Sequence, residues 1–363
     1  MIVIPSGKTE FYTHFPDVAA GYEAAITDEK VIDCNTVNSK RLDFQEPISI
    51  SFRSPQASHA RAIKEKYPNA ESITCAVDEL CCFKYSTFEN NRYVGGRFGD
   101  NMPFPKYENF DTFSLLAKSW QNGERYYPIL TEVGCPARCV YCAARNRGWA
   151  ARSAQNCFDE LWRAKRKWGI NYFMVMDDAF NMDIERVIDF CDLIIPLNLK
   201  WKAANGLRAD RCSQQMFKAM KMSGCNEVSF GVESIDNEVL KTIQKGESFE
   251  QIDRAVEWAK AADLMVNAYF IIGLPGSTYE TDLRAVEWVK QKKIRATFSY
   301  LLPQSDKPDD AQFFGNLAEP TSDAYPKEQQ KKIYQMTEGF RQKKANKFLK
   351  DLAIKTGLYN FLR

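Results

Sequence analysis

The sequence TEVGCPARCVYCAARNRGWAAR occupies residues 131–152 and contains three cysteines in the spacing Cys-x3-Cys-x2-Cys: Cys135, Cys139 and Cys142. Tyr141 stands directly before the last of them. Three thiolates on one short loop form a binding site for a soft metal. A structural zinc site is usually closed by four ligands, whereas an iron–sulfur cube held by three cysteines leaves one iron open to a substrate or cofactor. The alternatives are a chance group of buried thiols and an incomplete zinc knuckle.

Strand and helix patterns alternate regularly from residue 125 onward. We expect strands at 126–131, 172–176, 201–204, 228–232, 264–273 and 294–300, with helices between them. Strands that alternate with helices form a parallel sheet, and six such units in about 185 residues predict a sheet curled into a partial barrel. The active site of such a barrel lies at the carboxyl ends of the strands, which is where the cysteine loop begins.

Cys135, Cys139, Tyr141 and Cys142 together resemble the cluster-binding loop of the radical S-adenosylmethionine (radical SAM) superfamily. In that superfamily the amino and carboxylate groups of SAM chelate the open iron. The resemblance implies an α/β fold with a partial (βα)6 TIM-like barrel, and a 4Fe–4S cluster and SAM as cofactors. It also implies that an electron from the cluster cleaves SAM to methionine and a 5'-deoxyadenosyl radical, which abstracts a hydrogen atom from an organic substrate.

Charged residues follow the second and third predicted strands. The motif MVMDDAFN places Asp177 and Asp178 where the resemblance implies the amino group of SAM, and a carboxylate can hold an ammonium group. Alternatively, Asp178 caps the next helix. Arg208 in NGLRAD could pair with the SAM carboxylate through its planar guanidinium group. An exposed arginine without a partner is the alternative for Arg208.

The remaining candidate cofactor-binding residues belong to the fourth and fifth predicted strands: Ser229, Glu233 and Ser234 in SFGVES, and Ile272, Gly273 and Pro275 in FIIGLPG. The resemblance places the first three near the ribose or methionine part of SAM and the last three beside its adenine. Glu233 would be costly to bury without a partner, which favours a ligand role. Glycine lets a backbone approach a flat ring closely, and Pro275 stiffens the turn.

Residues 1–112 show short apolar runs alternating with helical patterns, which predict a small Rossmann-like α/β domain with a parallel sheet. This segment resembles a degenerate form of the cobalamin-binding domain found in one branch of the superfamily, so cobalamin is a candidate third cofactor. The cobalt-binding histidine of many such domains stands in an Asp-x-His-x-x-Gly motif, which neither His14 nor His59 matches. We expect the barrel at 113–305 and a helical extension at 306–363.

The amino-acid composition argues against some classes of protein and some binding partners. Lys+Arg 49 against Asp+Glu 47 give a net charge of +2, so no overall field favours nucleic acid or an anionic membrane. Eleven cysteines without a secretion signal or a long apolar segment predict a cytoplasmic protein with reduced thiols. Two histidines leave almost no material for histidine-based zinc sites or Ser/His/Asp triads.

The carboxyl-terminal segment is rich in basic residues: Lys331, Lys332, Arg341, Lys343, Lys344 and Lys347. A basic helix can bind nucleic acid or phosphate, although such helices are more often a solvated face around an apolar stripe. We therefore expect a small molecule or a modified biopolymer as substrate, with nucleic acid as the less favoured choice. A flavodoxin- or ferredoxin-type protein is the expected electron donor.

Three functions fit the sequence. The preferred one is a radical SAM enzyme that begins catalysis by hydrogen abstraction and goes on to a rearrangement or another change at a C–H bond. The second is a cobalamin-dependent radical SAM C-methyltransferase. The third belongs to another class, a non-catalytic iron–sulfur or zinc binding module, which would not need Arg208, Glu233 or the residues 270–276. The sequence identifies neither the substrate nor a catalytic residue outside the cofactor sites.

Overall fold

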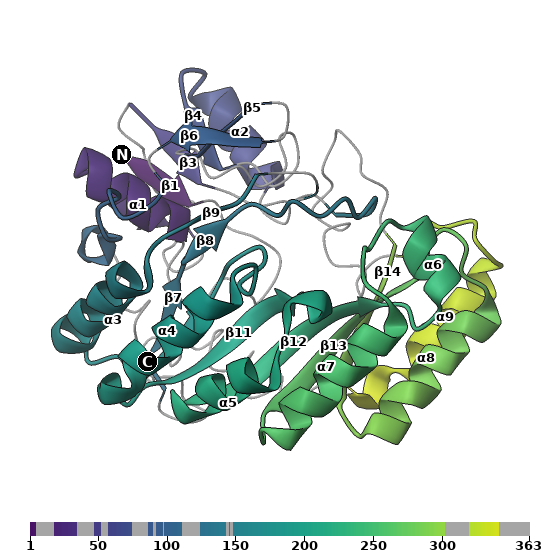
Figure 1. The fold of residues 1–363 in the computed structure, drawn as a ribbon. Helices are drawn as coiled ribbons and strands as arrows, with labels where there is room; N and C mark the ends of the chain where they lie inside the picture. The colour runs from purple at the N-terminus through teal and green to yellow at the C-terminus, as the bar shows by residue number, and fades with distance from the viewer. Residues whose placement is uncertain are drawn as a thin grey trace, which may run out of the picture.

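Two parallel sheets organise the chain, a large one in the middle and a small one near the amino terminus (Figure 1). The computed structural model describes residues 1–4, 18–34, 47–51, 57–74, 86–89, 92–96, 98–110, 124–142, 145, 148–301 and 319–340. None of the helices in these segments is both long and apolar enough to cross a membrane.

The large sheet has six parallel strands in the order β14-β13-β12-β11-β10-β7, which confirms the predicted partial barrel. The strands are β7 (Tyr126–Ile129), β10 (Tyr172–Val175), β11 (Lys200–Leu207), β12 (Cys225–Glu233), β13 (Met265–Ile272) and β14 (Arg295–Tyr300). β11 is longer than predicted because it continues through a register shift between Ala203 and Gly206. All six carboxyl ends therefore lie along one edge.

Helices cover one face of this sheet (Figure 1). They are α3 (Ala154–Trp168), α4 (Ile184–Ile194), α5 (Gln214–Met222), α7 (Phe249–Ala261) and α8 (Tyr279–Lys292). A short helix that the sequence did not predict, α6 (Asn237–Thr242), follows β12. Ser153 caps the start of α3 by accepting a hydrogen bond from the Asn156 N–H, and Gly169 ends the helix at φ 62°.

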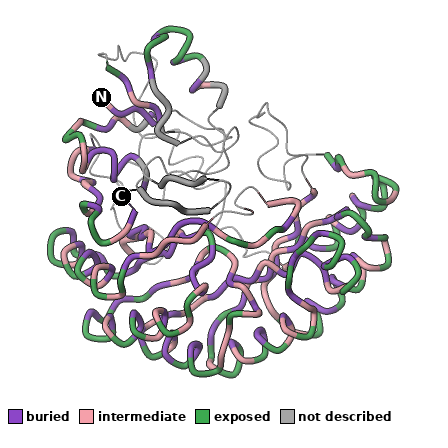
Figure 2. Tube along the Cα trace, turned by 45° about the horizontal axis from the view of Figure 1, so that its top comes forward, coloured by how far each residue is buried: buried purple, intermediate pink, exposed green. Residues whose placement is uncertain are grey.

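The core lies between the sheet and these helices. Alternate residues of β13 are buried, and the residues between them are partly exposed on the inner face of the barrel. Phe270 and Phe298 stack on neighbouring strands with ring centroids 4.4 Å apart, and Phe173 stacks on Trp201 at 5.4 Å. Buried residues concentrate along the strands and the helix faces that meet them (Figure 2). The hydrophobic effect therefore fixes which face of each strand points inward.

The small sheet has four parallel strands in the order β2-β1-β3-β4, as predicted for the amino-terminal region. It contains β1 (Ile2–Ile4), β2 (Val31–Asp33), β3 (Ser49–Ser51) and β4 (Glu71–Thr74), with helices α1 (Val18–Thr27) and α2 (Ala57–Lys66). Two short antiparallel pairs follow: β5 (Ser86–Glu89) with β6 (Arg92–Gly96), and β8 (Glu132–Val133) with β9 (Ala150–Ala151).

Arg152 connects the amino-terminal region to the large sheet. Its side chain is 1% exposed and pairs with Glu160 of α3 at 2.6 Å. The same guanidinium group donates hydrogen bonds to the Tyr22 hydroxyl of α1 at 3.0 Å and to the Leu130 carbonyl at 2.9 Å. Tyr127 of β7 donates to the other oxygen of Glu160 at 2.7 Å. One buried charge pair thus holds α1, α3 and the start of the cysteine loop together.

Part of the carboxyl-terminal extension packs against the end of β13. Helix α9 (Lys327–Met336) carries Gln330, which is fully buried. A Cβ atom at Gly273, where φ is 79°, would lie 2.8 Å from the Gln330 Oε1 and 2.9 Å from the Ser322 Cβ. Among the predicted basic residues, Lys331 and Lys332 belong to α9, and those from Arg341 onward lie outside the described residues, as do His14 and both boundaries at 112 and 305.

Replacing Gly224 with Ala tests the packing of helix α5 against the sheet. Gly224 has φ 97°, and a Cβ atom there would lie 2.2 Å from the Leu199 carbonyl oxygen. We expect G224A to lower the free energy of unfolding by at least about 2 kcal/mol, because strain and a backbone clash add together. Denaturant unfolding measures this. Gly339→Ala is the control, since no atom lies within 4 Å of its new Cβ; equal stability of both variants would contradict the packing.

Candidate active site at the carboxyl ends of the strands

The cysteine loop leaves the end of β7 and is held by two aspartates that follow β10. The Asp177 carboxylate accepts hydrogen bonds from the Thr131 N–H at 2.6 Å and from the Thr131 hydroxyl. Asp178 accepts from the Gly134 N–H at 2.9 Å. Asp177 is buried, and burial raises its pKa to about 6. Asp178 is exposed, and the alternative that it caps the next helix is wrong, because Asp183 is that cap.

The middle of the loop lies against residues 243–247, between α6 and α7. The Val140 N–H donates to the Ile243 carbonyl at 3.0 Å, and the Cys139 Sγ lies 3.9 Å from the Lys245 carbonyl oxygen. A turn within the loop joins the Cys142 N–H to the Cys139 carbonyl at 3.1 Å. Two of the three cysteines are therefore positioned by one turn that rests on the segment after β12.

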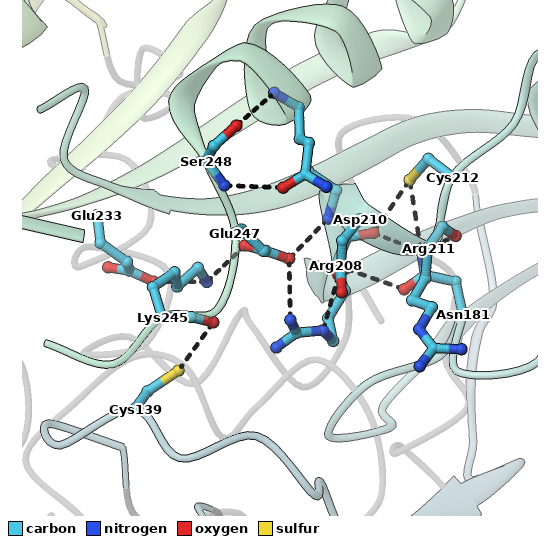
Figure 3. Close-up of polar contacts among 12 residues, drawn as sticks. Cys139, Asn181, Arg208, Asp210, Arg211, Cys212, Glu233, Lys245, Glu247 and Ser248 are labelled. Carbon is cyan, nitrogen blue, oxygen red and sulfur yellow. Dashed lines mark hydrogen bonds and ion pairs between the residues drawn. The ribbon is translucent and has the colours of Figure 1, made fainter. Parts of the chain in front are cut away.

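A network of charged side chains surrounds this contact (Figure 3). Lys245 Nζ lies 3.3 Å from Glu247 and 3.9 Å from Glu233, and all three side chains are nearly buried. Arg208 bonds to Asp210 at 2.9 Å and lies 3.7 Å from Glu247. The Ala209 N–H also donates to Glu247, at 2.8 Å. The alternative that Arg208 lacks a partner is therefore wrong.

Glu233 occupies the last position of β12 in a backbone conformation that is unusual for a residue with a side chain. Its φ is 67°, and the Ser234 N–H donates to the Val232 carbonyl at 2.8 Å across it, which is the hydrogen bond of a γ-turn. The Tyr141 side chain lies close enough to this carboxylate to affect its pKa. Burial raises the pKa of Glu233, while Lys245 and Tyr141 act in the opposite direction. The carboxylate is buried with partners, so its burial alone gives no argument for a ligand role.

Two glycines make room for the network. A Cβ atom at Gly231 would lie 2.7 Å from the Glu233 carboxylate and 3.2 Å from the Lys245 Nζ. A Cβ at Gly206, on the neighbouring strand, would lie 2.8 Å from the Gly231 backbone nitrogen. Because any side chain at Gly231 would displace the ion pair, this position requires glycine for space.

The other candidate residues are spread over different environments. Ser229 and Ser234 are buried on β12 and directly after it; the Ser229 hydroxyl lies beside that of Tyr269, and Ser234 accepts from the Asp236 N–H at 3.2 Å. Ile272 is part of the hydrophobic core and Pro275 is exposed. The space beside Gly273 that the sequence suggested for adenine holds Gln330 and Ser322 on its Cβ side. Asp178 therefore contacts the cysteine loop at Gly134, and Glu233 is linked to it through Lys245, whose backbone carbonyl lies beside Cys139.

A model of the radical SAM superfamily matches residues 129–289. The matched segment runs from the end of β7 into α8 and includes the cysteine loop and the charged network. Residues 129–289 are therefore identified as a radical SAM domain.

Two curated radical SAM relatives are methyltransferases by name. The chain is 30% identical over 200 residues to the uncharacterized methyltransferase PH0819 of Pyrococcus horikoshii, and 27% identical over 185 residues to the cytidylyl-2-hydroxyethylphosphonate methyltransferase of Streptomyces wedmorensis. These matches cover 54% and 48% of this chain and 42% and 35% of the relatives. The chain thus spans less than half of either relative.

Solved structures share the fold over a longer range. The methyltransferase TsrM of Kitasatospora setae, determined with cobalamin and a [4Fe-4S] cluster, aligns with a TM-score of 0.60 and 14% identity, covering 82% of this chain and 74% of that one. The cobalamin-dependent enzyme OxsB aligns with a TM-score of 0.58 and 16% identity over 79% of this chain and 51% of that one. At these identities the likeness concerns the fold, including the small parallel sheet before the barrel.

The chemistry of the loop fits a radical SAM iron–sulfur cluster. Its donors are three thiols, and thiolates are the preferred ligands of such clusters. Two cations, Arg208 and Lys245, lie close enough to Cys135 and Cys139 respectively to interact with them electrostatically. Burial raises the pKa of the Cys135 thiol.

The radical SAM core contains site residues that the sequence did not single out. Lys245 and Glu247 stand in QKGESFE, directly before helix α7, and Asp210 and Asn181 hold the Arg208 segment. A lysine and a glutamate around Gly246, in a loop after the fourth strand, could have been noticed as charges at the carboxyl edge. Their pairing with Glu233 and Arg208 depends on contacts between separate loops, which no local pattern contains.

Replacing Lys245 with Met tests the buried network. The change leaves Glu233 and Glu247 without their shared cation, and removing one partner of a buried ion pair typically costs about 3 kcal/mol or more. We expect that loss in the free energy of unfolding, measured by denaturant titration. Lys221→Met removes the exposed pair with Asp263 at 2.6 Å and should cost less than about 1 kcal/mol. A Lys245→Met variant as stable as Lys221→Met would contradict the burial of the network.

Proposed function

We propose that this protein is a radical SAM enzyme, and that cobalamin-dependent methyl transfer is its reaction. The observation that carries the first part is the loop of three cysteines at the carboxyl edge of a six-stranded parallel sheet, inside the segment that matches the superfamily. The second part rests on the names of the relatives and on the small parallel sheet shared with TsrM and OxsB. Hydrogen abstraction followed by a rearrangement, the reaction the sequence favoured, becomes the second candidate.

The cysteines have the clearest role in this proposal. Cys135, Cys139 and Cys142 would each bind one iron through a thiolate. A 4Fe–4S cluster held in this way would supply the electron that cleaves SAM reductively. Arg208 and Lys245 stabilise the negative charge of three thiolates in a partly buried loop.

SAM would lie over the same edge of the sheet. Asp178 is exposed beside Gly134 and is the better-placed carboxylate for the SAM ammonium, because Asp177 is engaged with Thr131. Arg208 retains its proposed role at the SAM carboxylate, held in orientation by Asp210. Ser229 and Ser234 on the fourth strand, and Ile272, Gly273 and Pro275 on the fifth, remain proposed for the ribose and adenine.

Cobalamin has less support among the residues than SAM. The only histidine within the described residues is His59 on α2, which is partly buried, and burial lowers its pKa. Because neither histidine stands in an Asp-x-His-x-x-Gly motif, the small sheet would hold the corrinoid without that histidine. We place the reaction in the cytoplasm, with a flavodoxin- or ferredoxin-type donor. The substrate is a small molecule or a modified biopolymer, and nucleic acid is the less supported class.

Replacing Cys139 with Ala tests the cluster. Anaerobic reconstitution of the unchanged protein should give about four irons per chain, and it should form 5'-deoxyadenosine from SAM and a strong reductant. Cys139→Ala removes one of three ligands and should abolish both. Cys191→Ala is the control, because that thiol is buried in the core at a pKa of about 12 and should not affect iron binding. Retention of the cluster by Cys139→Ala would end the proposal.

Cobalamin binding separates the two proposed reactions. If methyl transfer is correct, the protein reconstituted with hydroxocobalamin and passed through a desalting column retains about one corrinoid per chain, visible in its optical spectrum. A variant lacking residues 1–112 cannot serve as the control, because Arg152 would lose Tyr22. The control is instead a reconstitution without corrinoid. A cluster-containing protein that retains no corrinoid would refute methyl transfer through cobalamin and leave hydrogen abstraction as the reaction.

A further inference from the structure

The side chain of Asn181 bonds to the backbone of the segment that carries Arg208 (Figure 3). Its Oδ1 accepts a hydrogen bond from the Arg208 N–H at 2.9 Å, and its Nδ2 donates to the Arg208 carbonyl at 2.8 Å. Nδ2 also donates to the Arg211 carbonyl at 2.7 Å, and the whole side chain is buried. Because one amide holds both the N–H and the carbonyl of Arg208, the two peptide groups that flank its Cα are fixed.

These bonds connect two neighbouring strands beyond the point where their backbones stop pairing. The parallel pairing of β11 with β10 ends at Ala203. Further along, Asn205 of β11 donates to the Asp177 carbonyl, in the segment after β10, at 2.8 Å. Asn181 makes the reverse connection, from the segment after β10 to Arg208. An asparagine amide has a donor and an acceptor, as a peptide group has, so it can replace the missing pairing.

The guanidinium group of Arg208 is held separately, by two carboxylates. Its Nε donates to Asp210 at 2.9 Å, and its Nη2 lies 3.7 Å from Glu247. The Ala209 N–H donates to the same Glu247 oxygen at 2.8 Å. The carboxylates therefore direct the far end of the side chain, whereas Asn181 fixes the backbone from which it extends. A planar guanidinium group pairs with a carboxylate through two bonds only when both its position and its plane are correct.

We propose that Asn181 is a positioning residue for SAM, which directs the Arg208 guanidinium group at the SAM carboxylate by fixing the Arg208 backbone. This inference rests on the proposed radical SAM function and on the role proposed there for Arg208. A buried amide is costly unless its donor and its acceptor are both bonded, and here both bonds go to Arg208. Loss of Asn181 should therefore weaken the contact with the SAM carboxylate and leave contacts with the adenosine unchanged.

The experiment compares SAM with decarboxylated SAM, which keeps the adenosine, the sulfonium and the amino group but lacks the carboxylate. Equilibrium dialysis measures both affinities on the anaerobically reconstituted full-length protein, for the unchanged chain, Asn181→Ala, Arg208→Met and the double variant. Asn181→Ala should weaken SAM binding about tenfold, as expected for the loss of one hydrogen bond to a charged group, and leave the affinity for decarboxylated SAM unchanged. The double variant should bind SAM no more weakly than Arg208→Met, because Asn181 acts through Arg208.

A second readout needs neither the cluster nor SAM. Amide hydrogen exchange, followed by mass spectrometry of a peptide covering residues 208–212, should be faster in Asn181→Ala because the Arg208 N–H loses its acceptor. Asn171→Ala is the matched control, since this asparagine also accepts a backbone N–H of an arginine, that of Arg125 at 2.7 Å, but at the amino end of β10. It should leave both affinities and the exchange unchanged. If Asn181→Ala does not fold, Asn181→Asp carries the same test, because it keeps the acceptor but not the donor.

The outcomes separate the positioning role from the proposed function. If Asn181→Ala weakens the binding of both compounds equally, or if the double variant binds SAM more weakly than Arg208→Met, the positioning role is wrong. Faster exchange with unchanged SAM binding would mean that the amide only stabilises the fold, which also overturns it. If Arg208→Met does not discriminate between the two compounds, the roles of Arg208 and Asn181 are both wrong. An unchanged protein that assembles no cluster and forms no 5'-deoxyadenosine would instead refute the proposed function.

Discussion

The hydrogen bonds between Asp177 and Thr131 are the contact on which the site depends. In a parallel sheet every strand ends at the same edge, but the loops that leave that edge are free to diverge unless something joins them. Asp177 follows β10 and Thr131 follows β7, and these two strands are neighbours in the sheet. Their contact therefore also holds together the two loops that follow these neighbouring strands. The cysteine loop begins in a fixed place because the carboxylate is buried and fully used by protein donors.

The charges at this edge set a second constraint. Arg208, Lys245, Asp210, Glu233 and Glu247 include two cations and three carboxylates in a region that is largely buried. Burying charge is costly unless every group has a partner at close range. The glycines at 206 and 231 provide the necessary room, so two residues without side chains make the close approach of five charged ones possible. A structural metal site would have no use for such an arrangement, which agrees with an enzyme.

Much of the fold was predictable because it follows from local patterns. The spacing of apolar residues predicted all six strands of the barrel. The cysteine spacing predicted the family, whereas the hydrogen bond of Asp178 with Gly134 in the loop was not predicted. Lys245 and Glu247 were missed because their importance arises from contacts between segments far apart in the sequence. Sequence also could not show that Gln330 of α9 packs beside Gly273.

The contacts of the buried Arg152 also affect whether the amino-terminal region can be separated from the barrel. Its partners come from α1, α3 and the Leu130 carbonyl, and Phe104 lies 5.6 Å from its guanidinium group. In a chain beginning after residue 112, the charged Arg152 side chain would lose its contacts with Tyr22 and Phe104, which cover it. The small sheet and the barrel are thus joined by side-chain contacts as well as by their linker. Replacing the amino-terminal region would require other side chains that cover Arg152. Recombination between related proteins should therefore preserve these contacts of Arg152 even where the sequences of the two sheets have diverged.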